Sequence, residues 1–198
     1  MGQKKKFSLT LKLPAEYEPY RGILLFVATL LIANTIWKFS IHGDDGTTAY
    51  SSVLLWGMDV TFPFQFLTNS AATHSYNILK FIGQDLTIND LNIIKYHNGN
   101  AIRIVWSCSG LKQMYIFICT ILFSRGNWKK KIFAIPIGLV IIYGTNILRI
   151  LIITSCIENH KEWFHLLHEY ITKYGFYIII FLLWVIWDEV LSVNRINH

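Results

Sequence analysis

Cys108 is the residue whose type and position most clearly suggest chemistry. It lies in the sequence Trp-Ser-Cys-Ser-Gly, residues 106–110, where a polar, strand-like stretch gives way to an apolar helix. A thiol at a helix N-terminus meets unpaired backbone N–H groups and the positive end of the helix dipole, and both favour the thiolate. The pattern therefore indicates a reactive cysteine, and its alternative is a small apolar residue at a helix start.

A second candidate is Arg149, which lies three residues after Asn146 on one face of a predicted helix that also carries Tyr143 one turn inward. Arg149 is about 26 Å from Ile132, the start of this span, in a hydrocarbon core of roughly 30 Å. It is therefore expected near the outer leaflet, at the depth of Cys108. A charge at this depth indicates a functional residue, and its alternative is an arginine that snorkels to the outer headgroups.

Three histidines, His160, His165 and His168, follow in the loop 157–173, which is also expected outside. His165 and His168 are three residues apart and can share one face of a short helix. The loop matches neither the HExxH nor the HxxEH zinc pattern and offers no third ligand, so no metal or other cofactor is expected. Surface or packing histidines are the ordinary alternative. A thiol, an arginine and a histidine from three elements thus map to one depth.

The composition is typical of a polytopic membrane protein. Of 198 residues, 53% are hydrophobic and 15% charged, and the apolar residues form long runs. The formal net charge is +6, but most basic residues adjoin apolar segments, where they set topology and contact anionic lipid. Nucleic-acid binding is therefore not expected, and we predict a single membrane domain over residues 1–198.

The three cysteines include no C-x-x-C pair, so they make neither a disulfide framework nor a zinc site. Cys119 is expected in the core. Cys156 is either a core residue or, if the two approach, a partner for Cys108.

Four apolar runs can cross the bilayer, and the predicted fold is all-α with about four transmembrane helices. The first, at 22–39, follows three lysines and reads as an uncleaved signal anchor. The second, at 109–123, is short and is expected among other helices. The last two are predicted at 132–156 and 174–187, which gives a helical core over residues 108–190.

The segment 40–107 differs from the spans and is expected at the outer face. Residues 53–67 are apolar but include Asp, Pro and Gln, so they are predicted to lie in the interface or to re-enter the membrane. Residues 74–83 are typical of a short amphipathic helix. Asn-Gly between the β-branched runs 91–96 and 101–105 predicts a short β-hairpin that leads into the cysteine turn.

Basic residues predict the orientation. The N-terminal tail with its lysines and the basic loop 125–131 should both be cytoplasmic, because short basic segments stay inside. Four spans satisfy both assignments, whereas a crossing by residues 53–67 would move the loop outside. Cys108 is therefore expected at the extracytoplasmic face of the cytoplasmic membrane.

Together these motifs resemble the exosortase/archaeosortase family over roughly residues 98–187. The resemblance rests on Cys108-Ser109-Gly110 opening a transmembrane helix, on Asn146-Ile147-Leu148-Arg149 near the outer end of the next, and on His168 followed by Gly175 and Phe176. It implies an integral membrane cysteine enzyme, analogous to sortases, that cuts exported proteins near a C-terminal sorting signal and transfers them to another anchor. Its partners would be proteins ending in a short motif, an apolar helix and a basic cluster.

By this resemblance Cys108 is the nucleophile, Arg149 the family arginine and His168 the histidine of an exosortase-like Cys-Arg-His set, with His165 as its rival. An archaeosortase-type second arginine fits poorly, because the final loop has none.

The chemistry is coherent with these roles. A low dielectric disfavours the thiolate, so the cysteine needs a base, which His168 can supply. Arg149 can stabilise an oxyanion, with Asn146 holding its guanidinium, while Gly110 admits a substrate backbone and Ser109 supports it. The competing hypothesis is a non-enzymatic membrane scaffold or transport subunit, in which the arginine pairs with a lipid phosphate and the outer loops bind a partner.

Overall fold

The computed structural model describes residues 20–44, 52–90, 92–159, 161–163, 166–167 and 172–192. Its elements in chain order are α1 (Arg21–Ser40), β1 (Ile41–Gly43), β2 (Val53–Leu55), β3 (Met58–Asp59), α2 (Thr61–Phe81), β4 (Leu86–Asn89), β5 (Ile93–Tyr96), β6 (Ala101–Arg103), the 3₁₀ turn η2 (Trp106–Cys108), α3 (Leu111–Phe123), α4 (Trp128–Asn159), the 3₁₀ turn η3 (Lys161–Trp163), α5 (Thr172–Ile186) and the π-helical segment η5 (Trp187–Ser192).

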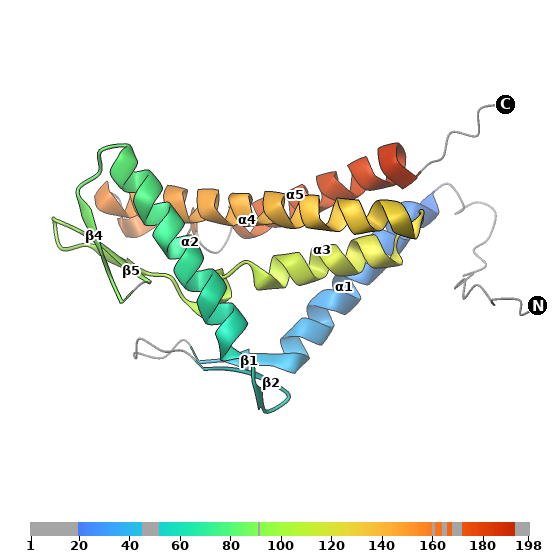
Figure 1. Ribbon diagram of the computed structural model, residues 1–198, viewed down its shortest axis with the longest axis horizontal. Helices are drawn as coiled ribbons and strands as arrows, with labels where there is room; N and C mark the ends of the chain where they lie inside the picture. The colour runs from blue at the N-terminus through green and yellow to red at the C-terminus, as the bar shows by residue number, and fades with distance from the viewer. Residues whose placement is uncertain are drawn as a thin grey trace, which may run out of the picture.

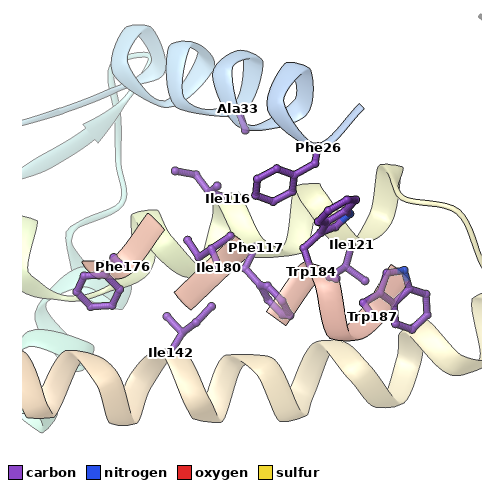
Figure 2. Packing of buried hydrophobic residues seen from close by; sticks show 10 residues of the cluster. All are labelled: Phe26, Ala33, Ile116, Phe117, Ile121, Ile142, Phe176, Ile180, Trp184 and Trp187. Atoms are coloured by element: carbon purple, nitrogen blue, oxygen red, sulfur yellow. The ribbon is translucent and has the colours of Figure 1, made fainter. Parts of the chain in front are cut away.

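Helix α4 runs along the longest dimension of the molecule. In Figure 1, α3 and α5 lie along α4, α2 crosses its C-terminal half, and α1 and α2 converge on the small sheet of β1 and β2. Side chains from α1, α3, α4 and α5 form the main apolar core, in which Phe26 of α1 packs against Trp184 with ring centroids 4.8 Å apart. Figure 2 shows these side chains meeting between the helices. The core thus ties the first helix to the last.

Two of the four predicted spans correspond to helices that are long and apolar enough to cross a membrane, namely α1 and residues Trp128–Cys156 of α4. The predictions at 109–123 and 174–187 correspond to α3, a shorter apolar helix, and to α5, which has 15 residues. Both α3 and α5 contribute side chains to the main core, so their short length is compatible with burial among neighbours.

Residues 53–67 fold as a hairpin followed by the start of a helix, and their location in the interface stays a prediction. Strands β2 and β3 form a tight hairpin here, because Trp56 and Gly57 take positive φ angles of 47° and 85°. Helix α2 then begins at Thr61, whose backbone N–H donates to Asp59 Oδ1 at 2.8 Å. The hydroxyl and N–H of Thr61 lower the pKa of the Asp59 carboxyl below its ordinary value.

The amphipathic helix predicted over 74–83 is the second half of α2, which has 21 residues. Pro63 does not break it, because Pro63 falls in the first turn, where backbone N–H groups have no partner within the helix. An apolar run with a proline therefore starts a helix here rather than an irregular segment.

The predicted hairpin is confirmed with shorter strands than expected, and it belongs to a three-stranded sheet. β5 pairs with β6, and Gly99 takes the positive φ of 87° that an Asn-Gly turn favours. The unpredicted strand β4 pairs with the other edge of β5. With the separate sheet β1–β2–β3, the fold is helical with two small antiparallel sheets, so the all-α class with a single hairpin needs this correction.

The basic loop predicted at 125–131 is largely the first turn of α4, which begins at Trp128. The side chain of Lys131 is buried, and its Nζ donates to the carbonyl oxygens of Leu122 at 2.8 Å and Ser124 at 2.6 Å. Carbonyls at the end of a helix have no partner within it. The Lys131 ammonium therefore closes the C-terminus of α3.

Close contacts fix the register of α3 against α4. A Cβ added at Gly138 would lie 2.1 Å from the ring of Phe117, so the bare backbone of α4 receives this side chain. Nearer the other end of the pair, a Cβ added at Gly110 would lie 3.3 Å from Asn146. The two helices are thus matched in antiparallel order from the Lys131 contact to the turn that holds Cys108.

Substituting Gly138 tests this register. Gly138→Ala should lower the free energy of unfolding by about 1–3 kcal/mol, because the added methyl group collides with Phe117 in a packed core. The measurement is thermal unfolding in detergent. Gly144→Ala in the same helix is the matched control, since nothing lies within 4 Å of its added Cβ, and it should be neutral or slightly stabilising. Equal behaviour of the two variants would contradict the packing described.

Candidate functional site

Cys108 ends the 3₁₀ turn η2, which links β6 to α3. Its backbone N–H donates to the carbonyl of Val105 at 2.8 Å, and its half-buried side chain packs against a cluster formed by α2, the second sheet and Ile150 of α4. Cys108 was predicted at the start of this helix, and it lies two residues before Gly110, the N-cap of α3, which begins at Leu111. The thiol therefore precedes the helix rather than capping it.

Ser109 and Gly110 shape the turn between Cys108 and α3. Ser109 Oγ accepts the backbone N–H of Leu111 at 3.3 Å, which satisfies one donor of the first helical turn. Gly110 has a φ of 81°, in the left-handed region that favours glycine. The two predicted supporting residues thus determine how the chain passes from the cysteine into the helix.

Asn146 connects this turn to α4. Its Nδ2 donates to the backbone carbonyl of Cys108 at 2.8 Å, and the residue is 0% exposed. Its Oδ1 is buried and accepts no hydrogen bond, so the expectation that Asn146 holds the guanidinium of Arg149 is wrong. The physical reason is that the turn before α3, rather than the next turn of α4, supplies the closest polar partner.

Arg149 lies one helical turn after Asn146, about 4.5 Å farther along α4 and about 60° around it. It is half-buried, and its Cζ lies 6.0 Å from the ring centroid of Phe176, at cation–π distance. Phe176 belongs to α5 and is itself buried. The arginine is therefore directed from α4 toward α5.

The structure thus brings Cys108, Ser109, Gly110 and Asn146 together and places Arg149 on the same helix as Asn146. The three candidate histidines, at positions 160, 165 and 168, lie outside the described residues. The site is built from η2, the start of α3 and the C-terminal half of α4.

His74, which was not predicted as a site residue, shares a hydrogen bond of 2.8 Å with the hydroxyl of Tyr143. The sequence patterns predict a helix beginning at His74 and a polar stripe that includes Tyr143, but they do not predict that the two residues meet. Because 69 residues separate the pair, no local pattern signals the contact. The bond fastens α2 to α4 one turn before Asn146.

All three cysteines are free thiols. Cys119 packs against the main core, as predicted, and Cys156 packs against Ile153 and Leu167 in a different cluster from Cys108. The alternative of a bond between Cys108 and Cys156 is therefore wrong. Within the described ranges, no three His, Cys, Asp or Glu side chains group in a way that would hold a metal ion.

The sheet β1–β2–β3 contacts the turn that holds Cys108. A Cβ added at Gly43 of β1 would lie 2.3 Å from the indole of Trp106, so the ring rests directly on the β1 backbone. Phe64 of α2 also packs against Trp106, edge-on, with ring centroids 5.8 Å apart. The turn is thus held by α4, by α2 and by β1.

A comparison with known families matches residues 23–185 to the family described as transmembrane exosortase (Exosortase_EpsH). The chain belongs to the transmembrane exosortase family. The match begins in α1 and ends in α5, so it extends well before the motifs on which the resemblance rested. Neither the curated proteins nor the solved structures offer a match to this chain. Family membership and the apolar helices together indicate a membrane protein.

Gly110→Ala tests the geometry of the cysteine turn. Alanine is strained at this left-handed φ, and its methyl group would lie close to Asn146, so the variant should lose about 1–3 kcal/mol of stability. The turn should shift, which should change the rate at which Cys108 is alkylated. The rate is measured with a maleimide in a background of Cys119→Ala and Cys156→Ala.

Gly99→Ala is the matched control for this experiment. It has a similar φ of 87° but nothing within 4 Å of the added Cβ. It should cost stability without altering alkylation of Cys108. An unchanged alkylation rate in Gly110→Ala would show that the contact with Asn146 does not position the thiol.

Proposed function

We propose that this protein is a membrane-embedded cysteine transpeptidase that cleaves C-terminal sorting signals of exported proteins and transfers the proteins to another anchor. The observation that carries the proposal is that the carbonyl of Cys108 is hydrogen-bonded to Asn146, one helical turn from Arg149, in a chain of the transmembrane exosortase family. A cysteine whose backbone is fixed to the helix that carries the arginine supports a role in acyl transfer.

The first half of the reaction forms a thioester. His168 removes the proton from the thiol of Cys108, and the sulfur attacks the carbonyl carbon of the scissile peptide bond. Arg149 stabilises the negative oxygen of the tetrahedral intermediate. The carbon–nitrogen bond then breaks, and the leaving amine takes the proton from His168.

The second half releases the exported protein. A nucleophile with an N–H or O–H group attacks the thioester carbonyl, its proton passes to His168, and the sulfur leaves as the thiolate. Transfer to an anchor requires this nucleophile to come from the anchor, whereas attack by water would give hydrolysis. The same residues serve both halves, as microscopic reversibility favours.

The site is proposed to face outward from the cytoplasmic membrane. The basic residues at the start of α4 and before α1 stay on the cytoplasmic side, which leaves η2 and the C-terminal half of α4 at the other end. A substrate tail with a basic cluster has the same orientation, so its recognition motif emerges on the side of Cys108.

Replacement of the thiol tests the proposed nucleophile. Cys108→Ala should abolish processing of a tailed substrate in cells while leaving membrane insertion unchanged, because the substitution removes only the sulfur from a half-buried position. Processing is followed by the shift in substrate mass on immunoblots. Cys119→Ala and Cys156→Ala are the controls and should retain activity. Processing by Cys108→Ala in cells without a related enzyme would favour the scaffold or transport hypothesis.

The partners of the thiol are tested with purified variants. Arg149→Lys should lower kcat/KM by roughly 100-fold or more, because an ammonium group cannot present two donors in one plane. His168→Ala should be at least as severe, while His165→Ala should be mild. Mass spectrometry of the intact protein then shows whether an acyl group accumulates on Cys108. Full activity in both Arg149→Lys and His168→Ala would remove the proposed roles.

A further inference from the structure

A cavity of about 260 Å³ lies beside the cysteine turn. It is bounded by the end of α1, by β1, by the first turns of α2 and by the segment from η2 into α3. The lining residues are Trp37, Lys38, Ile41, Phe64, Trp106, Ser107, Ser109 and Lys112. The walls therefore combine three aromatic rings and an isoleucine with the ammonium and hydroxyl groups of two lysines and two serines.

The cavity lies at the depth of lipid headgroups. α1 has 20 residues and a length of about 30 Å, which equals the thickness of the hydrocarbon core of a bilayer. Trp37 and Lys38 occupy the last turn of α1. Tryptophan and lysine at the end of a membrane span are typical of the interface between hydrocarbon and headgroups.

The charge of the cavity favours an anion. Lys38 and Lys112 bring two positive charges, and none of the eight lining residues is acidic. The hydroxyl group of Ser107, which is exposed, adds a hydrogen-bond donor. Lysine is a common ligand of phosphate groups, to which it offers a compact charge and several N–H donors.

The surface next to the cavity favours a lipid as the source of the anion. Leu31, Ile32, Ile36 and Phe39 are exposed on α1 and can contact acyl chains, and Leu31 lies two helical turns before Lys38 on the same face. The volume is below the roughly 300–1,000 Å³ typical of sites that enclose a drug-sized ligand. It therefore suits a headgroup whose chains remain outside in the bilayer.

We propose that this cavity binds the phosphate-containing headgroup of an anionic membrane phospholipid. Lys38 and Lys112 hold the phosphate, and the aromatic walls contact the glycerol region. Binding of this lipid does not depend on the catalytic role proposed for Cys108.

A lipid fits the cavity better than the scissile region of a peptide substrate does. Cys108 is not among the lining residues, since its side chain packs against the cluster of α2 and the second sheet. Its neighbours Ser107 and Ser109 line the cavity instead. A bound ligand would therefore lie beside the thiol, on the same turn, without occupying the place where a carbonyl must meet the sulfur.

The test is native mass spectrometry of the full-length protein in detergent, titrated with phosphatidylglycerol or phosphatidylcholine. The parent protein should retain phosphatidylglycerol more strongly. Lys38→Gln/Lys112→Gln should weaken this binding by about tenfold or more, because each basic residue contributes to affinity for anionic lipid. Lys38→Arg/Lys112→Arg preserves the charge and should retain most of the affinity.

A matched double variant, Lys80→Gln/Lys95→Gln, removes the same charge from exposed positions outside the cavity and should bind like the parent. The proposal is overturned if Lys38→Gln/Lys112→Gln binds phosphatidylglycerol as the parent does, or if the matched double variant loses binding equally. Displacement of the lipid by glycerol phosphate at equal concentration would assign the cavity to soluble phosphates. Displacement by an acidic peptide would assign it to a protein partner.

Discussion

The hydrogen bond from Asn146 to the carbonyl of Cys108 is the constraint on which the arrangement of the site depends. Asn146 is fully buried, so its amide cannot exchange this partner for water, and leaving such a group unsatisfied costs about 1–3 kcal/mol. It joins the turn before α3 to the middle of α4. Because Gly110 has no side chain, the amide can approach the turn closely enough to form it. The thiol is thereby placed relative to one rigid helix.

The hydrogen bond fixes the position of the cysteine turn only because α3 and α4 cannot slide past each other. Phe117 fills the space above Gly138, and Lys131 holds the last carbonyls of α3 at the far end of the pair. A shift of one turn would remove both contacts and would bury an ammonium group without partners, which is costly in an apolar setting. The position of the cysteine is thus set by packing that extends along the whole length of α3.

Local patterns predicted the elements well where short-range chemistry determines them. The Asn98-Gly99 turn, the apolar helices and the polar stripe of α4 all follow from neighbouring residues. Prediction failed where distant partners decide the outcome: His74 binds Tyr143 from another helix, and Asn146 turns to a carbonyl 38 positions away instead of to Arg149. The β2–β3 hairpin within residues 53–67 was not predicted, because the positive φ angles at Trp56 and Gly57 have no signature in the hydropathy of the segment.

The contact between Gly43 and Trp106 gives the first third of the chain a structural role. This role is not evident from the sequence, because that part of the chain has no reactive motif. The indole next to the cysteine turn lies on bare backbone supplied by a strand that directly follows α1. A tilt of α1 in the bilayer would therefore move this support, and the movement would reach the turn through a single rigid ring. Helix α1 and the turn that holds Cys108 are therefore mechanically coupled, so the thickness of a bilayer that α1 spans would act on the geometry around Cys108.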